Sequence, residues 1–411
     1  MSTLLFRNAR QVVTCERADA SSVHDRVDLL VRNGRVAAIG AGLDAEGAPV
    51  IDARDHVITP GFIDSHTHAV FGGWRAAEYE MRCQGIGYME IARRGGGINA
   101  SIRDVRAMSE AELLEVTRPR VAQIIALGTT TLEIKSGYGL TLDDELKQLR
   151  VIRALQQECS IDIVPTFLGA HEFPPEYRDD RDAYVDLIIE EMLPAVAAER
   201  LAVFCDVFLE PGVFTRDQAR RILTAAREHG MKLKLHADEF ENGGAAELAA
   251  ELGATSADHL GAISDAGIAA LAGSATVGTL LPATLLFLGK HTYAPARRMI
   301  DSGVTIALAT DFNPGTAPSP SMPLVLTMAC SLMSMTPLEA LCAATAGGAR
   351  ALDLPEGCGT LAVGAPADLL LWEVADYREI AYRFGALAPA AVFKAGHAAC
   401  EGVVKPVSSG R

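Results

Sequence analysis

The chain has 411 residues, 49% of them hydrophobic, and a formal charge of −15 at pH 7. This length suits one large domain with a smaller one beside it. The acidic balance, with no tract of Lys and Arg to relieve it, argues against nucleic acid and against an anionic membrane surface as partners. No apolar stretch reaches about 18 residues without interruption, so we expect no membrane span.

The eight cysteines are spread along the chain and form no Cys-x-x-Cys pair. Their spacing indicates neither a thiolate zinc site nor a disulfide scaffold. The first seven residues, Met1 to Arg7, lack the basic region, the long apolar run and the cleavage site of a secretory leader. We therefore expect a soluble, cytoplasmic protein with reduced cysteines.

Short strand-like runs mark both ends of the chain. The first of these regions has turns such as Asn33-Gly34 between its runs, and similar runs return near the end, as at 367–372. The simplest assembly joins both termini. We expect a small β-sandwich-like domain made of residues 1–57 and 353–411.

The middle of the chain, residues 58–352, alternates strand-like runs with helical stretches rich in Ala, Leu, Glu and Arg. This alternation is typical of parallel βα units. Eight such units predict a (β/α)8 TIM-type barrel, an α/β fold whose enzymes carry their reacting groups at the carboxyl ends of the strands. The predicted strands are 57–64, 129–134, 161–168, 205–209, 232–235, 254–257, 275–280 and 304–309.

The most informative motif is the first of these strands, because it leads into His66 and His68. Successive strand side chains point to opposite faces, so these two histidines share a face and can bind one metal ion. Two unrelated surface histidines would explain an isolated His-x-His. Here, however, polar residues suited to metal binding also follow other strands, which favours a metal at the mouth of a barrel. They are His171, His236, His259 and Asp311.

We assign four residues as ligands of one metal ion: His66, His68, His236 and Asp311. Each histidine alone has an ordinary explanation as a core or capping residue, but their joint placement favours a ligand set. Three imidazoles and a carboxylate, with one position left for water, would lower the pKa of that water towards neutrality. Such nitrogen and oxygen donors suit zinc and iron equally well.

Four more residues are candidates for substrate chemistry. Glu239, three residues after His236, can move a proton between water and a leaving nitrogen, with a solvated acid at a helix start as the alternative. His259 can orient the water or the substrate carbonyl. Arg75 suits a substrate carboxylate, unless it is an ordinary surface arginine. Tyr138 lies in a loop flanked by glycines, which we expect to be flexible, and its phenol can donate to a bound anion.

Lys135 and Glu210 raise the question of a second metal ion. A modified lysine can bridge two ions, but Lys135 follows the second predicted strand, and the fourth is followed by Glu210 instead of a lysine. Glu210 precedes Pro211-Gly212 and is more simply explained as a loop acid. A site with one metal ion is therefore favoured.

The chain resembles the amidohydrolase superfamily over essentially its whole length. The resemblance rests on the segment from Pro60 to His68 and on Gly359-Thr360-Leu361, followed by Gly364 and Ala367-Asp368-Leu369. Within that superfamily the chain most resembles the imidazolonepropionase family. The segments that carry this finer resemblance are 68–75, 133–139, His171-Glu172, 236–239 and 311–316.

The resemblance implies hydrolysis of the ring amide C–N bond of 4-imidazolone-5-propanoate to N-formimino-L-glutamate. It also implies one zinc or iron ion per subunit and a homodimer. Asp311 and His259 would steer the attacking water, Glu239 would pass a proton to the leaving nitrogen, and Arg75 would hold the propionate. The residues that match family substrate contacts are Arg75, Tyr138, His171, Glu239, Asn313, Gly315 and Thr316.

The sequence is also compatible with two other functions. An aminohydrolase similar to cytosine deaminase would need the same histidines and acids, but a neutral base gives Arg75 no carboxylate to bind. A catalytically silent barrel that acts as an assembly partner is the second alternative. It would require lost ligands, and none of the four assigned ligands is lost.

Overall fold

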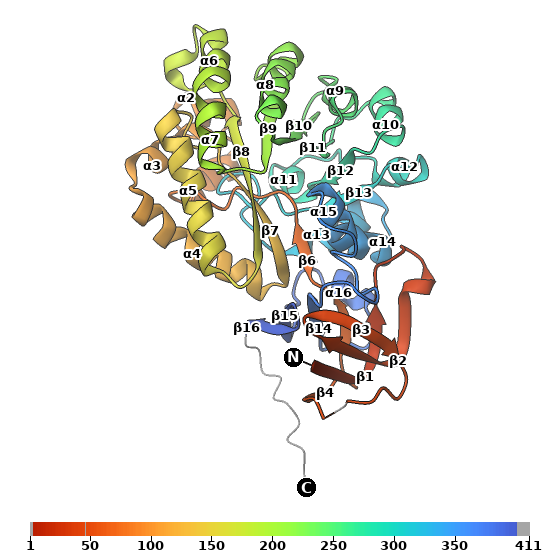
Figure 1. The fold of residues 1–411 in the computed structure, drawn as a ribbon. Coiled ribbons are helices and arrows are strands. Elements are labelled where there is room, and N and C mark those ends of the chain that lie inside the picture. The colour runs from red at the N-terminus through yellow and green to blue at the C-terminus, as the bar shows by residue number, and fades with distance from the viewer. Residues whose placement is uncertain (1–2, 46, 401–411) are drawn as a thin grey trace.

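A computed structural model describes residues 3–45 and 47–400, which form a barrel with a smaller sheet beside it (Figure 1). Neighbouring barrel strands are all parallel. The predicted (β/α)8 fold class is confirmed. The barrel strands, in spatial and chain order, are β6 (Phe62–Asp64), β7 (Thr129–Lys135), β8 (Asp162–Ala170), β9 (Phe204–Leu209), β10 (Lys232–Ala237), β11 (Ser256–His259), β12 (Val277–Leu280) and β13 (Ile306–Leu308).

Hydrogen bonds just beyond β6 and β13 close the barrel. The backbone N–H and the hydroxyl of Thr310 donate to the carboxylate of Asp64, at 3.0 and 2.6 Å. The N–H of Asp311 donates to the carbonyl of His66 at 3.0 Å. Barrel closure therefore places the histidine segment after the first strand beside the aspartate that follows the last.

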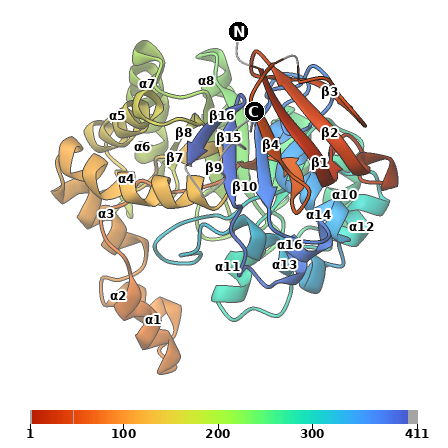
Figure 2. The ribbon, with the colours of Figure 1, turned by 90° about the horizontal axis from the view of Figure 1, so that it is seen from below.

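Most of the α-helices cover the outside of the barrel, whereas α1 and α2 project away from it (Figure 2). Among the described residues, none of them is both long and apolar enough to cross a membrane. The helices are α1 (Ala76–Cys83), α2 (Tyr88–Arg93), α3 (Ile98–Ala107), α4 (Glu110–Ala126), α5 (Leu142–Glu158), α6 (Arg181–Leu187), α7 (Leu193–Glu199), α8 (Arg216–Glu228), α9 (Ala245–Leu252), α10 (Asp265–Ala272), α11 (Pro282–Phe287), α12 (Ala296–Asp301), α13 (Met322–Met333), α14 (Pro337–Cys342), α15 (Gly348–Ala351) and α16 (Arg378–Tyr382).

Helix α8 illustrates why the sequence forms these helices. Its Thr215 side chain accepts from the N–H of Gln218, while the Gln218 side chain accepts from the N–H of Thr215. This capping box satisfies two backbone donors at the start of the helix. The buried residues then recur on one face at helical spacing, so the helix packs that face against β9 and β10. They are Ala219, Ile222, Leu223 and Ala226.

Strands from both ends of the chain form the smaller sheet, in the order β16-β15-β14-β5-β1-β2-β3, with β4 beside β1 (Figure 1). Antiparallel pairing of β14 with β5 joins the two ends. Residues 1–2, 46 and 401–411 of the predicted terminal domain lie outside the described residues. The strands are β1 (Thr3–Val13), β2 (Val23–Arg32), β3 (Arg35–Gly40), β4 (Val50–Asp52), β5 (Val57–Pro60), β14 (Leu369–Trp372), β15 (Ala391–Lys394) and β16 (His397–Cys400).

The predicted strand 57–64 is two strands in the structure. Residues up to Pro60 belong to the small sheet as β5, whereas β6 belongs to the barrel. Gly61 separates them, and a Cβ there would overlap the side chain of Thr130. The expectation of one continuous strand was wrong because periodicity does not reveal a crossing from one sheet to another.

Trp372 joins the small sheet to the barrel. Its buried indole N–H donates to the hydroxyl of Thr59 at 2.9 Å, and its ring packs against Phe62 of β6 with centroids 5.9 Å apart.

We expect Thr59→Val to lower the free energy of unfolding by about 1–3 kcal/mol, because it leaves the indole N–H without an acceptor.

Denaturant unfolding followed by tryptophan fluorescence would measure the effect of Thr59→Val. Thr59→Ser keeps the hydroxyl and is the control. Equal losses in the two variants would show that the hydrogen bond does not carry the effect.

Candidate metal centre and substrate cavity

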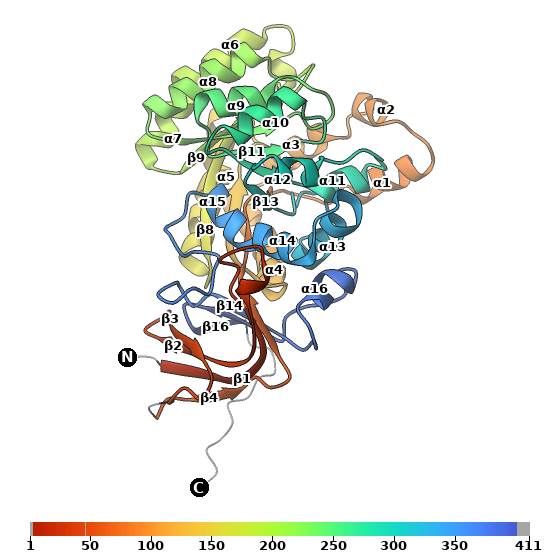
Figure 3. The ribbon, with the colours of Figure 1, turned by 90° about the vertical axis from the view of Figure 1, so that its right-hand side faces the viewer.

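A cavity of about 780 Å³ opens at the carboxyl ends of the barrel strands. Residues flanking and within α1 contribute to one wall, and Figure 3 shows α1 and α2 extending away from the barrel. The structure brings most of the sequence-predicted site residues together here, while His66 is fully buried behind the wall. Those lining the cavity are His68, Arg75, Tyr138, His171, His236, Glu239, His259, Asp311, Asn313 and Thr316.

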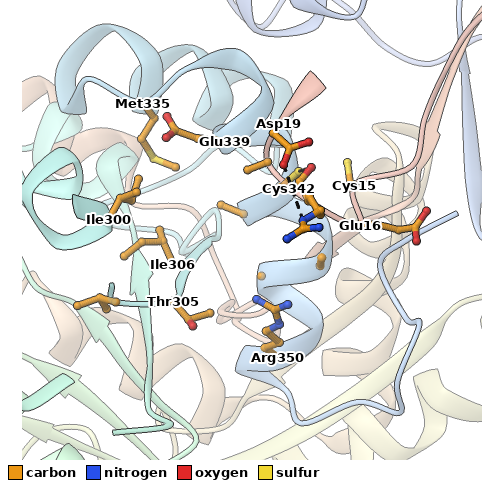
Figure 4. A pocket seen from close by; sticks show the side chains of 16 residues that line it. Cys15, Glu16, Asp19, Ile300, Thr305, Ile306, Met335, Glu339, Cys342 and Arg350 are labelled. Atoms are coloured by element: carbon orange, nitrogen blue, oxygen red, sulfur yellow. Dashed lines mark hydrogen bonds and ion pairs between the residues drawn. The ribbon is translucent and has the colours of Figure 1, made fainter. Parts of the chain in front are cut away.

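A second cavity, of about 430 Å³, lies at the opposite end of the barrel (Figure 4). Thr305 and Ile306 line it at the amino end of β13, together with Cys15 and Cys342. The described residues of its wall include no histidine. Because barrel enzymes use the carboxyl ends of their strands for catalysis, the first cavity is the candidate active site.

Two of the assigned histidine ligands converge on one carboxylate oxygen, and the third lies beside them. Asp311 Oδ1 lies 3.6 Å from His66 Nε2 and 3.4 Å from His68 Nε2. The ring of His236 lies 4.5 Å from that of His66, centroid to centroid. Ligands of a tetrahedral zinc ion with bonds of about 2.0–2.1 Å would lie roughly 3.3 Å apart. The spacing at Asp311 therefore fits donors that share one ion.

The imidazoles have the protonation state that a metal requires. Burial lowers the pKa of His66 and His68 well below the ordinary value, with neighbouring positive groups adding to the effect. These rings are therefore neutral near pH 7. The Nε2 atoms of His66, His236 and His259 are buried without a hydrogen-bond partner, so they are free to donate lone pairs.

Other ligand sets share the same histidines. His259 can join His66 and His236, and His171 can join His68 and His236, around one point. Asp311 touches two of the histidines and carries a negative charge that offsets a cation, which favours it as the fourth ligand. The residues present therefore fit a metal ion in this cavity.

Two buried aspartates hold the outer nitrogens of the histidines. Asp258 Oδ2 accepts from His66 Nδ1 at 2.7 Å, and Asp206 Oδ2 lies 3.1 Å from His236 Nδ1. A proton on each Nδ1 leaves Nε2 as the metal-binding atom. The sequence reasoning missed both aspartates as functional residues. For Asp206 the signal was an acid inside the otherwise apolar strand β9, whereas Asp258 precedes His259 in a strand that is mostly polar.

Asp311 and His259 hold strained backbone conformations. Their φ angles are +54° and +78°, in a region that residues other than glycine rarely adopt. Such strain persists where surrounding contacts enforce it, often at active sites. For Asp311 one such contact is the hydroxyl of Thr284, which donates to Oδ2 and leaves Oδ1 facing the histidines.

Glu239 and His259 lie together beside the metal ligands, with Oε1 and Nδ1 3.6 Å apart. Burial raises the pKa of Glu239 well above its ordinary value, and the carboxylates of Asp311 and Glu210 add to the shift. Burial lowers the pKa of His259 to about 3. The raised pKa of Glu239 favours its protonated form, and His259 beside it is a neutral imidazole near neutral pH.

Glu210 shapes the loop that carries Glu239. Its carboxylate accepts the N–H groups of Glu239, Phe240 and Glu241, at 3.0, 3.1 and 2.7 Å. These bonds occupy the oxygens that a second metal would need. The structure therefore gives Glu210 the position of a loop acid.

Arg75 reaches the cavity with donors to spare. Its Nε and Nη1 are buried and have no hydrogen-bond partner, and the closest carboxylate, on Glu78, lies 3.9 Å from Nε. The guanidinium packs so closely on Gly315 that a Cβ there would overlap Nη2. A largely buried guanidinium with two donors that lack hydrogen-bond partners is suited to an anionic ligand.

Asn313 organises the loop after β13. Its amide oxygen accepts the N–H groups of Gly315 and Thr316 at 2.8 and 2.7 Å, and its amide nitrogen donates to the carbonyl of Asp311 at 2.7 Å. The side chain thus satisfies its hydrogen bonds within the loop. It fixes where Gly315 and Thr316 lie relative to Arg75.

The segment with Tyr138 is held in place, contrary to the expected flexible loop. Glu145 accepts the N–H groups of Gly137, Gly139 and Leu140, at 3.1, 2.9 and 2.8 Å. His171 stacks on His68 with centroids 5.0 Å apart. Its Nδ1 lies 2.9 Å from the carbonyl of Gly137. The phenol of Tyr138 is therefore presented by a rigid turn.

The barrel and the buried histidines and aspartate at its mouth define a metal-dependent hydrolase. The amidohydrolase family model matches residues 57–399. An imidazolonepropionase of Solibacter usitatus is 49% identical over 371 residues, covering 89% of each chain. One of Symbiobacterium thermophilum is 48% identical and covers 96% of each. The chain belongs to the imidazolonepropionase family of amidohydrolases.

Solved structures resemble the whole chain at low sequence identity. An adenosine deaminase of Xanthomonas campestris with bound zinc has a TM-score of 0.73 and 19% identity, covering 100% of this chain and 95% of that one. An N-isopropylammelide isopropylaminohydrolase of Burkholderia multivorans has a TM-score of 0.70 and 20% identity, covering 97% and 98%. At these identities the likeness shows the fold alone.

We expect Asp311→Asn to lose most of the bound metal, because the substitution removes the negative charge of the carboxylate next to His66 and His68. Metal content after dialysis against a chelator would measure the loss. Asp238→Asn is a matched control, since Asp238 accepts the N–H groups of Gly243 and Ala246 and should affect folding alone. Full metal retention in Asp311→Asn would contradict the ligand assignment.

Proposed function

We propose that the protein hydrolyses the ring amide C–N bond of 4-imidazolone-5-propanoate to N-formimino-L-glutamate. The observation that carries this proposal is the position of Arg75 in the same cavity as the histidine and aspartate cluster. The substrate has both features that this cavity serves: a ring carbonyl open to water and a propionate at the far end. The family relatives named imidazolonepropionases support the same reaction.

We assign one metal ion to His66, His68, His236 and Asp311, and propose zinc or iron as its identity. When bound, the metal supplies Lewis-acid chemistry, which polarises the carbonyl and makes water more acidic. The imidazole nitrogens and the single carboxylate suit both metals. We also assign Asp311 a role as a catalytic residue that steers the attacking water, since its Oδ1 lies among the histidines, 3.4 Å from His68 Nε2.

The chain's own residues orient the substrate. The unused donors of Arg75 bind the propionate and turn the ring carbonyl towards the histidines. We assign Tyr138 and His171 to the ring, on the wall next to His68. Gly315 and Thr316, held by Asn313, complete the wall beside the arginine.

Glu239 and His259 provide the proton chemistry. Addition of water to the ring carbonyl must be followed by protonation of the ring nitrogen as its bond to that carbon breaks. Burial raises the pKa of Glu239, which favours its protonated form, so it can donate to this nitrogen. The neutral imidazole of His259 lies beside Glu239. We assign it a hydrogen bond that orients the attacking water towards the ring carbonyl.

An aminohydrolase that removes ammonia from a neutral ring is the nearest alternative. It would use the same histidines and acids, but it would leave the buried Nε and Nη1 of Arg75 without a hydrogen-bond partner, with the carboxylate of Glu78 3.9 Å from Nε. That cost weighs against a neutral substrate. Release of ammonia from cytosine or a guanine-like base would support the alternative.

The direct test follows the loss of imidazolone ultraviolet absorbance with purified protein. Turnover should disappear after chelation and return when zinc or ferrous ion is added. Absence of turnover with a metal-loaded, folded protein would contradict the proposed reaction.

We expect Arg75→Ala to raise KM by roughly tenfold to a hundredfold with little change in kcat, since hydrogen bonds to a charged group contribute about 1.5–3 kcal/mol. Gly315→Ala should act in the same direction by displacing the guanidinium. Gly87→Ala is the control, because Gly87 lines the same cavity and a Cβ there meets nothing within 4 Å. Unchanged KM in Arg75→Ala would place the propionate elsewhere.

Glu239→Gln should lower kcat by about 10²- to 10⁴-fold and leave KM nearly unchanged, because the amide cannot donate an acidic proton. Steady-state kinetics would separate the two constants. Glu172→Gln is the matched control, since Glu172 lines the same cavity and accepts the N–H of Phe173. A change in KM alone would assign Glu239 to binding.

Three further expectations from the sequence stay proposals. We place the domain limits at 1–57 with 353–411 and at 58–352. We also propose a homodimer and a cytoplasmic location for this small-molecule enzyme. Sedimentation of the purified chain would test the dimer.

A further inference from the structure

Lys135 is a fully buried lysine at the end of β7, beneath the metal ligands. Its ammonium lies 2.7 Å from Glu133 Oε1, 2.8 Å from Asp206 Oδ2 and 4.0 Å from Asp258 Oδ2. Each of these carboxylates is also fully buried. Lys135 therefore pairs directly with Glu133 and Asp206, and it shares Asp258 with the buried Lys234, whose ammonium lies closer to that carboxylate, at 3.5 Å.

Each of the three carboxylates leads to a metal ligand. Asp206 contacts Nδ1 of His236, and Asp258 accepts from Nδ1 of His66. Glu133 reaches the same ligands through the backbone, because its Oε2 accepts the N–H of Thr67, the residue between His66 and His68. The three contacts start from one ammonium group.

The backbone of Lys135 makes a fourth connection to this segment. Its N–H donates to the carbonyl of Thr67 at 2.9 Å, and the hydroxyl of Thr67 donates to the carbonyl of Glu133 at 2.6 Å. Hydrogen bonds of both the backbone and the side chain of Thr67 thus hold the histidine segment against β7.

We infer that Lys135 is a positioning residue for the metal centre, acting on His66, His68 and His236 through Asp258, Glu133 and Asp206. This inference rests on the ligand set given under the proposed function. It also answers the question of a modified lysine. The ammonium of Lys135 is engaged by carboxylates on the far side of the histidines, so it takes the place that a second cation would need.

The two possible roles of Lys135, as a positive charge alone or as a positioning residue, predict opposite effects of its removal on metal affinity. If Lys135 were only a positive charge near the metal, its removal would strengthen binding of a cation. If Lys135 holds the carboxylates that orient the imidazoles, its removal weakens binding. Loss of such an outer partner typically costs about 10- to 100-fold in metal affinity.

The test is a titration of the metal-stripped full-length protein with Zn²⁺ against a chromophoric chelator, and with Co²⁺ followed by its visible absorption. Lys135→Met should bind Zn²⁺ roughly 10- to 100-fold more weakly than the wild type. Its Co²⁺ spectrum should also change, because the geometry of the ligands changes. Tighter binding, or a second equivalent of metal, would overturn the inference.

A double-mutant cycle separates positioning from general destabilisation. If Lys135 acts through Asp206, the variant Lys135→Met with Asp206→Asn loses less affinity than the product of the two single losses. Independent, multiplicative losses would overturn the inference. Lys394→Met is the control, because Lys394 of β15 also bridges two carboxylates, those of Asp162 at the start of β8 and Asp368 next to β14. It should keep the wild-type affinity and spectrum.

Glu133→Gln provides the second variant if Lys135→Met does not fold. It keeps the lysine and the side-chain shape but removes one charge that holds the ammonium, so we expect a smaller loss of affinity in the same direction. Wild-type affinity in folded Glu133→Gln would overturn the inference. Wild-type affinity in Asp311→Asn would instead refute the ligand set, and with it the proposed function.

Discussion

Closure of the barrel between β6 and β13 is the constraint on which the site depends. The ligands lie far apart in the sequence, at the first, fifth and eighth strands. They meet because Thr310 is hydrogen-bonded to Asp64 and Asp311 is hydrogen-bonded to the backbone of His66. Without this closure, the carboxylate of Asp311 would have no fixed position relative to the histidines.

The second constraint on the site is the set of charged side chains buried beneath it. A dry interior makes an ion costly unless it is paired, yet the floor of the site contains two lysines and three carboxylates with no exposure. Lys234 adds to the network of Lys135 by lying 3.5 Å from Asp258. We interpret these charges as the means by which neutral imidazoles keep one orientation, while Arg75 and Glu239 face the substrate cavity.

The sequence predicted the barrel well because strands and helices alternate at a scale that periodicity resolves. It also predicted His66, His68 and His236 as a group, since a histidine at a strand end is unusual. It did not predict that residues 57–64 cross between two sheets, because Gly61 gives no periodic signal. The roles of Asp206 and Asp258 were not predicted, because each role depends on contact with a histidine of another strand. Such contacts are fixed only in the folded barrel.

The central claim is that three histidines and one aspartate hold a single ion at the mouth of this barrel. Anomalous X-ray diffraction from crystals of the metal-loaded protein tests it most directly. We expect one peak, bonded to Nε2 of His66, His68 and His236 and to Oδ1 of Asp311. A peak among Glu133, Asp206 and Asp258, or two peaks in one subunit, would contradict it.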